Sequence, residues 1–83
     1  MTDSNTTVDF YWRPGCGFCM LLSRRLKKAG VPMAKYNIWD EPKAAAFVRS
    51  VANGNETVPT VVIGDQAMVN PSAKQVINAL QTT

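Results

Sequence analysis

The sequence predicts a single α/β domain with a mixed β-sheet, and three observations point to this fold class. Stretches typical of strands and of helices alternate as far as residue 52, and such alternation favours a parallel β-α-β crossover. Two strand-like runs, 60–63 and 66–69, then follow each other with only Gly64-Asp65 between them, which is typical of an antiparallel hairpin. One further amphipathic stretch completes a β-α-β-α-β-β-α order.

The first strand and helix are predicted by a change of hydrophobic pattern. The run Val8–Trp12 is rich in aromatic and branched residues and ends at Arg-Pro-Gly, so it is expected to be a buried strand. A helix is expected over about 16–29, followed by Gly30 and Pro32 as a stop signal. Its apolar positions at helical spacing are Phe18, Leu22, Leu26 and Ala29.

A second strand is expected over 34–38 and a second helix over about 41–52. Asp40 is the expected N-cap, with Pro42 in the first turn, where its missing N–H costs nothing. The helix should end at 53–55, a run of asparagine and glycine. Its expected apolar face is Ala45, Val48 and Ala52, with Phe47 and Val51 beside it.

The last helix begins with a predicted capping box. Ser72 and Gln75 have the Ser-x-x-Gln spacing in which each partner satisfies a backbone N–H of the first turn. The apolar face of this helix is Val76, Ile77 and Leu80. We therefore expect one domain over residues 8–83, preceded by a flexible polar tail at 1–7.

Charge and composition narrow the class of function. The net charge is +3 and the pI is about 9.1, with four basic residues in the segment 24–28. These charges either complement the end of a helix or steer anionic substrates, and no motif or interleaved aromatics indicate nucleic-acid binding. No apolar run is long enough for a membrane helix, and residues 1–7 lack the pattern of a signal peptide. We expect a cytoplasmic protein without membrane partners.

The only two cysteines, Cys16 and Cys19, stand three apart at the junction of the first strand and helix. A disulfide between them closes a ring too small to stabilise the fold much, so redox chemistry is the better interpretation. A helix N-terminus favours a thiolate, so Cys16 is expected to be the exposed nucleophile and Cys19 the more buried resolving cysteine. A zinc site would need four ligands, and the chain has no histidine. We expect no bound metal, although a dimer-bridging iron–sulfur cluster stays open as an alternative.

Neighbours of the cysteines are further candidates for binding a substrate or small thiol. Gly17 would let a substrate approach the sulfur closely, and Arg13 could attract an anionic partner, although turn chemistry and solvation explain both equally well. Phe18 is interpreted as a contact surface at the rim of the site. Further along, Thr57-Val58-Pro59 opens the third strand, where proline is tolerated. If the peptide bond before Pro59 is cis, the Val58 backbone could pair with an extended substrate.

These motifs together resemble the glutaredoxins of the thioredoxin superfamily. Strand, Cys16-Gly17-Phe18-Cys19, helix and Thr57-Val58-Pro59 occur in the order and spacing of that family, and the likeness extends from Val8 to about Leu80. The resemblance implies a thioredoxin-like fold, with a four-stranded sheet in the order 2-1-3-4 and helices on both faces. It also implies a cis peptide bond before Pro59, opposite Cys16.

Within this family the chain looks most like the mycoredoxins, which use mycothiol in place of glutathione. The likeness rests on the cysteine motif, on 44–48 with 54–61, and on Asn70-Pro71-Ser72. Usual glutaredoxins carry Gly-Gly and a polar or acidic stretch for the glutamyl end of glutathione, where this chain has 67–72. The resemblance implies mycothiol as co-substrate, with Asn70 and Ser72 among its contacts, and no tightly bound cofactor.

We therefore expect a monomeric thiol–disulfide oxidoreductase that reduces mixed disulfides. Its expected partners are mycothiol or a similar small thiol, client proteins in mixed disulfides, and a thiol–disulfide reductase that recharges it. Two alternatives stay open at this point: an electron donor to ribonucleotide reductase and a dimer that bridges an iron–sulfur cluster. The first is disfavoured because such donors usually carry a glutamine between the cysteines and an aromatic-rich C-terminal segment, and both are missing here.

Overall fold

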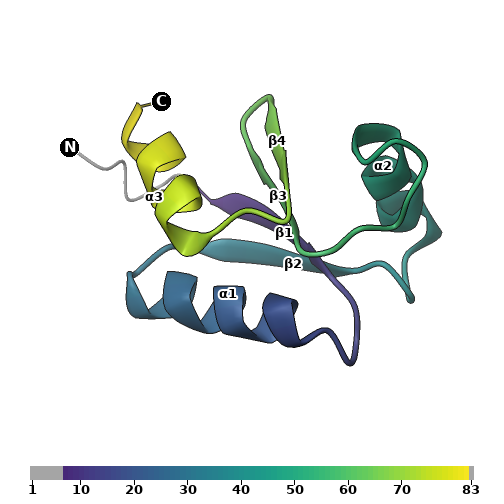
Figure 1. The fold of residues 1–83 in the computed structure, drawn as a ribbon, viewed down its shortest axis with the longest axis horizontal. Helices are drawn as coiled ribbons and strands as arrows, with labels where there is room; N and C mark the ends of the chain where they lie inside the picture. The colour runs from purple at the N-terminus through teal and green to yellow at the C-terminus, as the bar shows by residue number, and fades with distance from the viewer. Residues whose placement is uncertain (1–6, 83) are drawn as a thin grey trace.

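The computed structural model describes residues 7–82, so the predicted tail lies, apart from Thr7, outside the described residues. The chain forms a four-stranded sheet in the order β2-β1-β3-β4, with three helices (Figure 1). Strand β1 is parallel to β2 and antiparallel to β3, and β3 and β4 form an antiparallel hairpin. The predicted fold class and strand order are confirmed.

The observed elements begin and end close to the predicted positions. The first two helices are each one residue shorter at both ends than expected. The outermost expected residues are the caps: Cys16 and Ala29 for the first helix, and Glu41 and Ala52 for the second. The second strand is shifted by one residue, since Met33 already pairs with Val8. The strands are β1 (Val8–Trp12), β2 (Met33–Asn37), β3 (Thr60–Ile63) and β4 (Gln66–Val69), and the helices are α1 (Gly17–Lys28), α2 (Pro42–Val51) and α3 (Ala73–Thr82).

Two hydrophobic cores lie on opposite faces of the sheet, because residues of a strand alternate between its faces. Val8 and Phe10 of β1 belong to the core under α1 and α3, whereas Tyr11 packs into the core under α2. Figure 1 shows α1 and α3 together and α2 apart from them. The first core also contains Leu22, Leu26, Val61, Ile63, Val76, Ala79 and Leu80, and the second is built from Ile38, Ala44, Ala45, Val48 and Ala52.

The buried stripe of α1 differs from the predicted one. The inward positions are Cys19, Leu22 and Leu26, which recur at i, i+3 and i+7. Ala29, expected on that face, is exposed, and so is Phe18, which the sequence indicated both for this stripe and for the rim of the site. The stripe through Cys19 holds this cysteine against the core, next to Cys16.

The N-cap of α2 was predicted wrongly. Glu41, not Asp40, occupies the cap position, and its side chain makes no capping hydrogen bond. The Asp40 carboxylate instead accepts a hydrogen bond from the Asn37 side-chain amide at 3.2 Å. Pro42 stands in the first turn, as predicted. At the other end of α2, Gly54 (φ +86°) donates its N–H to the Arg49 carbonyl at 2.8 Å, which ends the helix.

The face of the sheet under α2 is lined by aromatic rings. Tyr11 stacks between Tyr36 and Phe47, with ring centroids 5.1 and 5.0 Å away. Burial raises the pKa of the Tyr11 phenol above its usual range, and the nearby charge of Asp9 adds to the effect. Across residues 7–82, no helix has the length and hydropathy needed to cross a membrane.

Candidate active site

The two cysteines occupy the N-terminus of α1 and form a disulfide. Cys16 is the N-cap residue, with extended backbone angles, and Cys19 lies in the first turn of the helix. Their Cα atoms are 5.2 Å apart, a separation that a disulfide can span. The loop that leads from β1 reaches this point through Gly15, whose φ of +76° is readily accessible only to glycine.

The backbone N–H of Cys19 points at the sulfur of Cys16, 3.2 Å away. In the reduced protein this N–H and the dipole of α1 would both stabilise a negative charge on Cys16, because the first N–H groups of a helix lack partners within it. The sulfur of Cys19 has no such position, since Cys19 lies within the helix. The geometry therefore makes the two cysteines chemically unequal.

Burial distinguishes the cysteines only slightly. We expected an exposed Cys16, but its exposed fraction is 6%, against 2% for Cys19. Both cysteines belong to the core under α1. The hydrogen bond to Cys16, rather than exposure, is the main difference between them.

The segment Thr57-Val58-Pro59 forms a wall beside the disulfide. The Val58–Pro59 peptide bond is cis, as the resemblance implied. The Val58 carbonyl oxygen lies 3.8 Å from Cys16 Sγ. Two hydrogen bonds hold the segment: the Thr60 hydroxyl donates to the Thr57 carbonyl at 2.8 Å, and the Asn70 N–H donates to the Pro59 carbonyl at 2.8 Å.

Arg13 lies in the loop before Cys16 but turns toward other groups. Its guanidinium lies 5.7 Å from the centre of the Trp39 ring and donates to the Pro14 carbonyl at 3.1 Å. Among the contacts of the described residues, none joins Arg13 to a cysteine sulfur. The loop and the turn after β2 are thus held together by a cation–π contact.

The two residues between the cysteines face outward. Phe18 is 71% exposed, and a Cβ added to Gly17 would meet no atom within 4 Å. Nothing in the backbone requires glycine at this position, in contrast to Gly15. The open space over Gly17 adjoins Cys16, the preceding residue of the chain.

Asn70 and Ser72 connect β4 to α3, on the side of the disulfide where Pro59 lies. Asn70 has a positive φ of 52°, which asparagine tolerates better than most residues. Ser72 forms the predicted capping box: its hydroxyl accepts the Gln75 N–H at 3.1 Å, and its N–H donates to Gln75 Oε1 at 2.8 Å. The Ser72 hydroxyl is thus already engaged in holding α3.

A small hollow of about 70 Å³ lies between α1 and the start of α3. Three residues of its wall, Phe18, Pro59 and Asn70, were predicted as binding residues from the sequence, and the others were not. The only sequence signal for these other residues was the basic segment 24–28, because Arg25 of that segment lines the hollow. The remaining lining residues are Leu21, Leu22, Pro71 and Ala73.

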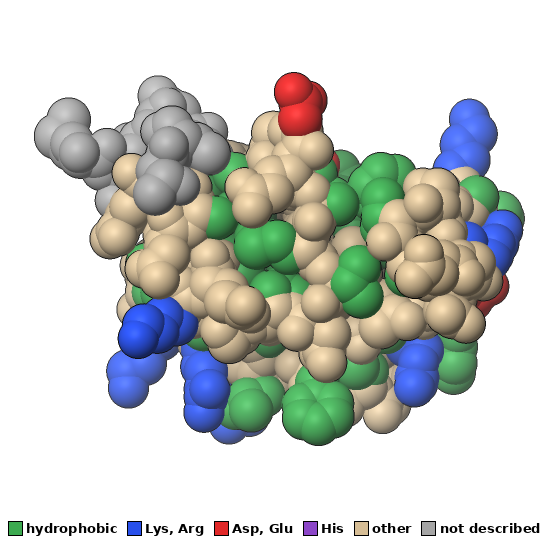
Figure 2. Space-filling model, turned by 45° about the horizontal axis from the view of Figure 1, so that its top comes forward, with side chains coloured by type: hydrophobic (Ala, Val, Ile, Leu, Met, Phe, Trp, Pro, Cys, Tyr) green, Lys and Arg blue, Asp and Glu red, His purple; other side chains and the backbone are tan. Residues whose placement is uncertain are grey.

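Exposed hydrophobic side chains surround this end of the molecule. Figure 2 shows such side chains along the lower edge of the view, where Figure 1 places α1, with Lys and Arg on both sides. Across the described residues, the large hydrophobic side chains that are exposed are Phe18, Met20, Leu21, Trp39 and Val69. Within residues 7–82, no group of three or more His, Cys, Asp or Glu side chains is arranged to hold a metal ion.

Comparison with known proteins agrees with this arrangement. The family model described as Glutaredoxin matches residues 8–68. A protein of Mycobacterium tuberculosis (strain H37Rv) that carries the name glutaredoxin is 39% identical over 70 residues, which cover 83% of each chain. A glutaredoxin-named protein of Synechocystis is 32% identical over 59 residues, or 71% of this chain and 67% of its own.

Solved structures support the fold. The NrdH-redoxin of Escherichia coli superposes with a TM-score of 0.74 at 24% identity, covering 87% of this chain and 92% of its own. At this level of identity the similarity concerns the fold alone. The family match and the sequence relatives carry the assignment further: the chain belongs to the glutaredoxin family, and it is a thiol–disulfide oxidoreductase.

Proposed function

We propose that this protein reduces mixed disulfides, with Cys16 as the nucleophile and Cys19 as the resolving cysteine. The observation that carries the assignment of roles is the 3.2 Å contact from the Cys19 N–H to Cys16 Sγ at the N-terminus of α1. A thiolate is the reactive form in disulfide exchange, and this position favours a thiolate at Cys16. Cys19, one turn further along the core-facing stripe, is placed to attack Cys16 afterwards.

The reaction consists of successive thiol–disulfide exchanges. Cys16 thiolate attacks one sulfur of the mixed disulfide, so that a bond to Cys16 forms and the original S–S bond breaks, releasing the other sulfur as a thiolate. In the monothiol route a second small thiol then attacks this intermediate and regenerates Cys16. In the dithiol route Cys19 attacks Cys16 Sγ, the bound thiol leaves, and the disulfide of the structure forms. Two electrons pass from the protein to the substrate in the second case.

The substrate is expected to pair with the backbone of Val58. Among the hydrogen bonds of the described residues none involves the Val58 N–H, and the Val58 carbonyl oxygen lies 3.8 Å from Cys16 Sγ. An extended peptide or a peptide-like thiol can satisfy both groups as an added strand. Thr57 and Pro59 fix this stretch, while Gly17 leaves room for the reacting sulfur.

We propose mycothiol as the small thiol. The hollow beside Pro59 is lined by Asn70, Arg25 and apolar side chains, and none of its lining residues is acidic. Glutathione presents an ammonium group beside a carboxylate at its glutamyl end, and this wall has Arg25 for the carboxylate but no acidic side chain for the ammonium group. Mycothiol presents a neutral sugar and cyclitol instead, which can hydrogen-bond to the Asn70 amide and to Arg25. Ser72 contributes by holding α3 rather than through a free hydroxyl.

This function implies a cellular context. Mixed disulfides between small thiols and proteins are reduced where the thiol pool is kept reduced, so we place the protein in the cytoplasm as a monomer. Its partners are then mixed-disulfide client proteins and a reductase that restores the small thiol. No specific observation favours the two alternatives, an electron donor to ribonucleotide reductase and a cluster-bridging dimer. The similarity to NrdH-redoxin concerns the fold alone and does not support the first of them.

Two single-cysteine variants test the assignment of roles. We expect Cys16→Ser to abolish the reduction of mixed disulfides, because no other cysteine occupies the helix N-terminus. Cys19→Ser should still reduce mixed disulfides with small thiols through the monothiol route. It should no longer reduce disulfides within client proteins, because that reaction needs both cysteines. Turnover of each substrate class, measured with both variants and the parent, gives the comparison.

The same pair of variants provides the control, since each lacks the disulfide and keeps one thiol. Alkylation by iodoacetamide at pH 7 should be faster in Cys19→Ser, which keeps Cys16, than in Cys16→Ser. Equal turnover by Cys16→Ser and the parent would contradict the proposal.

A further inference from the structure

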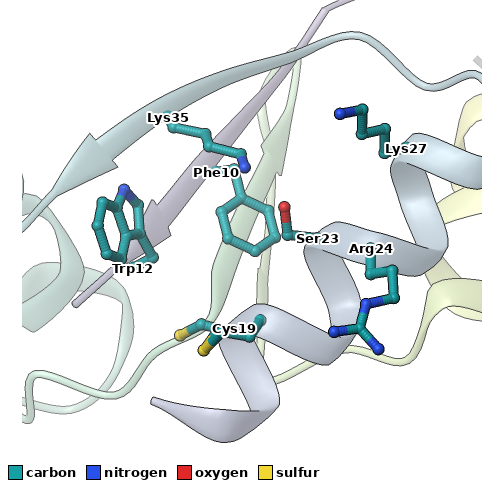
Figure 3. A pocket seen from close by; sticks show the side chains of 8 residues that line it. Phe10, Trp12, Cys19, Ser23, Arg24, Lys27 and Lys35 are labelled. Atoms are coloured by element: carbon teal, nitrogen blue, oxygen red, sulfur yellow. The ribbon is translucent and has the colours of Figure 1, made fainter. Parts of the chain in front are cut away.

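A second, larger pocket lies on the other side of α1, where no member of the redox site except Cys19 takes part. It has a volume of about 380 Å³, within the range of small-molecule sites. It opens between α1 and the edge strand β2, above Phe10 and Trp12 (Figure 3). It shares no lining residue with the hollow beside Pro59. The two faces of α1 therefore border two different spaces.

The floor and the rim of this pocket differ in chemistry. The floor is the Phe10 ring, which is almost fully buried, with Trp12 and Cys19 beside it. Met20 of α1 also lines the pocket. The rim is polar, and Figure 3 shows the Lys27 and Lys35 side chains reaching from α1 and β2 toward the space over Phe10. The complete rim is Ser23, Arg24, Lys27 and Lys35.

Lys35 lies in an unusual place for a lysine. It pairs with Phe10 in the sheet register, and directly paired residues of neighbouring strands share a face, here the face that α1 covers. Its side chain is nonetheless exposed, and a charge on an edge strand can protect that edge from pairing with other chains. Edge protection does not require two further cations from α1, nor an apolar hollow between them.

The charges around the pocket have one sign. Arg24, Lys27 and Lys35 are basic, and none of the eight lining residues is acidic. Like charges around one space repel each other, and a bound anion relieves this repulsion. Lysine ammonium groups are hydrogen-bond donors only, so they fit a group that only accepts, such as a phosphate.

We propose that this pocket binds a small aromatic phosphate ester. Its planar ring packs against Trp12 and the Met20 thioether, above the almost fully buried Phe10, and aromatic rings favour such contacts. Its phosphate is held by Lys27 and Lys35, with Arg24 and the Ser23 hydroxyl at the rim. Apart from Cys19, the pocket shares no residue with the proposed mixed-disulfide reaction, which uses the side of Cys16 that faces Val58.

NMR titration of the oxidised protein with 1-naphthyl phosphate tests the proposal. The variant Trp39→Phe serves as the background, because it leaves Trp12, one of two tryptophans, as the only indole N–H signal. Trp39 is exposed and lies outside the pocket, so its replacement should preserve the fold. We expect a saturable shift of the Trp12 signal with 1-naphthyl phosphate, at least about fivefold weaker binding of neutral 1-naphthol, and no such shift with inorganic phosphate.

Charge variants supply the matched control. Lys27→Gln and Lys35→Gln should each weaken binding of 1-naphthyl phosphate about threefold, as expected for exposed ionic contacts, and the double variant about tenfold. Lys28→Gln removes the neighbouring charge of the same helix end, outside the pocket, and should change the dissociation constant less than about twofold. Binding that is equal for 1-naphthol, or unaffected in the double variant, would overturn the proposal.

Discussion

The sulfur of Cys16 lies between two backbone groups of opposite polarity. The Cys19 N–H is 3.2 Å away and favours a thiolate, whereas the Val58 carbonyl oxygen, 3.8 Å away, would accept the proton of a thiol. The shorter contact and the helix dipole act in the same direction, toward the charged form. The reactivity that we propose for Cys16 therefore depends on where α1 begins, and less on the small exposed fraction of this residue.

Gly17 offers a residue-scale prediction. Gly17→Ala should leave the free energy of unfolding within about 0.5 kcal/mol of the parent, because the added methyl group meets no neighbour and the backbone needs no positive φ. The same methyl group stands beside Cys16, so the rate of reduction of a glutathione- or mycothiol-bound protein should fall severalfold. Urea unfolding and single-turnover reduction measure the two effects.

Gly15→Ala is the matched control for this prediction. Its φ of +76° makes the same substitution costly, by about 1–2 kcal/mol, although no neighbour would contact the new Cβ. If Gly17→Ala reduced large mixed disulfides as fast as the parent, the substrate would have to reach Cys16 from another side.

At the scale of elements, the start of α3 places Asn70 against Pro59. The reciprocal hydrogen bonds of Ser72 and Gln75 fix the first turn of this helix, and the Asn70 N–H ties the same connection to the Pro59 carbonyl. The capping box thus supports one side of the site without touching the disulfide.

We expect Ser72→Ala to destabilise the protein by about 1 kcal/mol, the usual effect of losing an N-cap. For a domain of this size that corresponds to a lower melting temperature by about 4–8 °C. Ser72→Asp should keep most of the stability, because aspartate also caps helices. Thermal unfolding of the three proteins checks this, and a Ser72→Ala protein as stable as the parent would show that the cap contributes little.

The sequence was sufficient for elements whose signals are local. The two-residue turn at Gly64, the capping box of α3 and Pro42 in the first turn of α2 are each visible in neighbouring residues. The cap of α2 was missed because Asn37, outside that helix, binds the Asp40 carboxylate. Local preference cannot anticipate a competitor of this kind.

At the scale of the whole molecule, the site and the pocket depend on distances between elements. The cysteines and Pro59 could be assigned from a motif, but the contact between Cys16 and Val58 follows from the pairing of β1 with β3. The pocket beside Lys35 was not predicted, because it depends on how far α1 extends over β2. The only sequence feature that pointed to this pocket was the basic segment 24–28. Its charges could be explained either by complementation of the helix dipole or by steering of anions, and the sequence did not decide between the two.

The direct test of the proposed function compares two substrates that differ only in the small thiol. A protein cysteine is converted to its mixed disulfide with mycothiol or with glutathione, and kcat/KM is measured for each with the reduced protein and with Cys16→Ser as the blank. The wall of Asn70 and Arg25, with no carboxylate among the lining residues, predicts at least about tenfold preference for the mycothiol substrate, or about 1.4 kcal/mol. Equal or faster turnover of the glutathione substrate would contradict it.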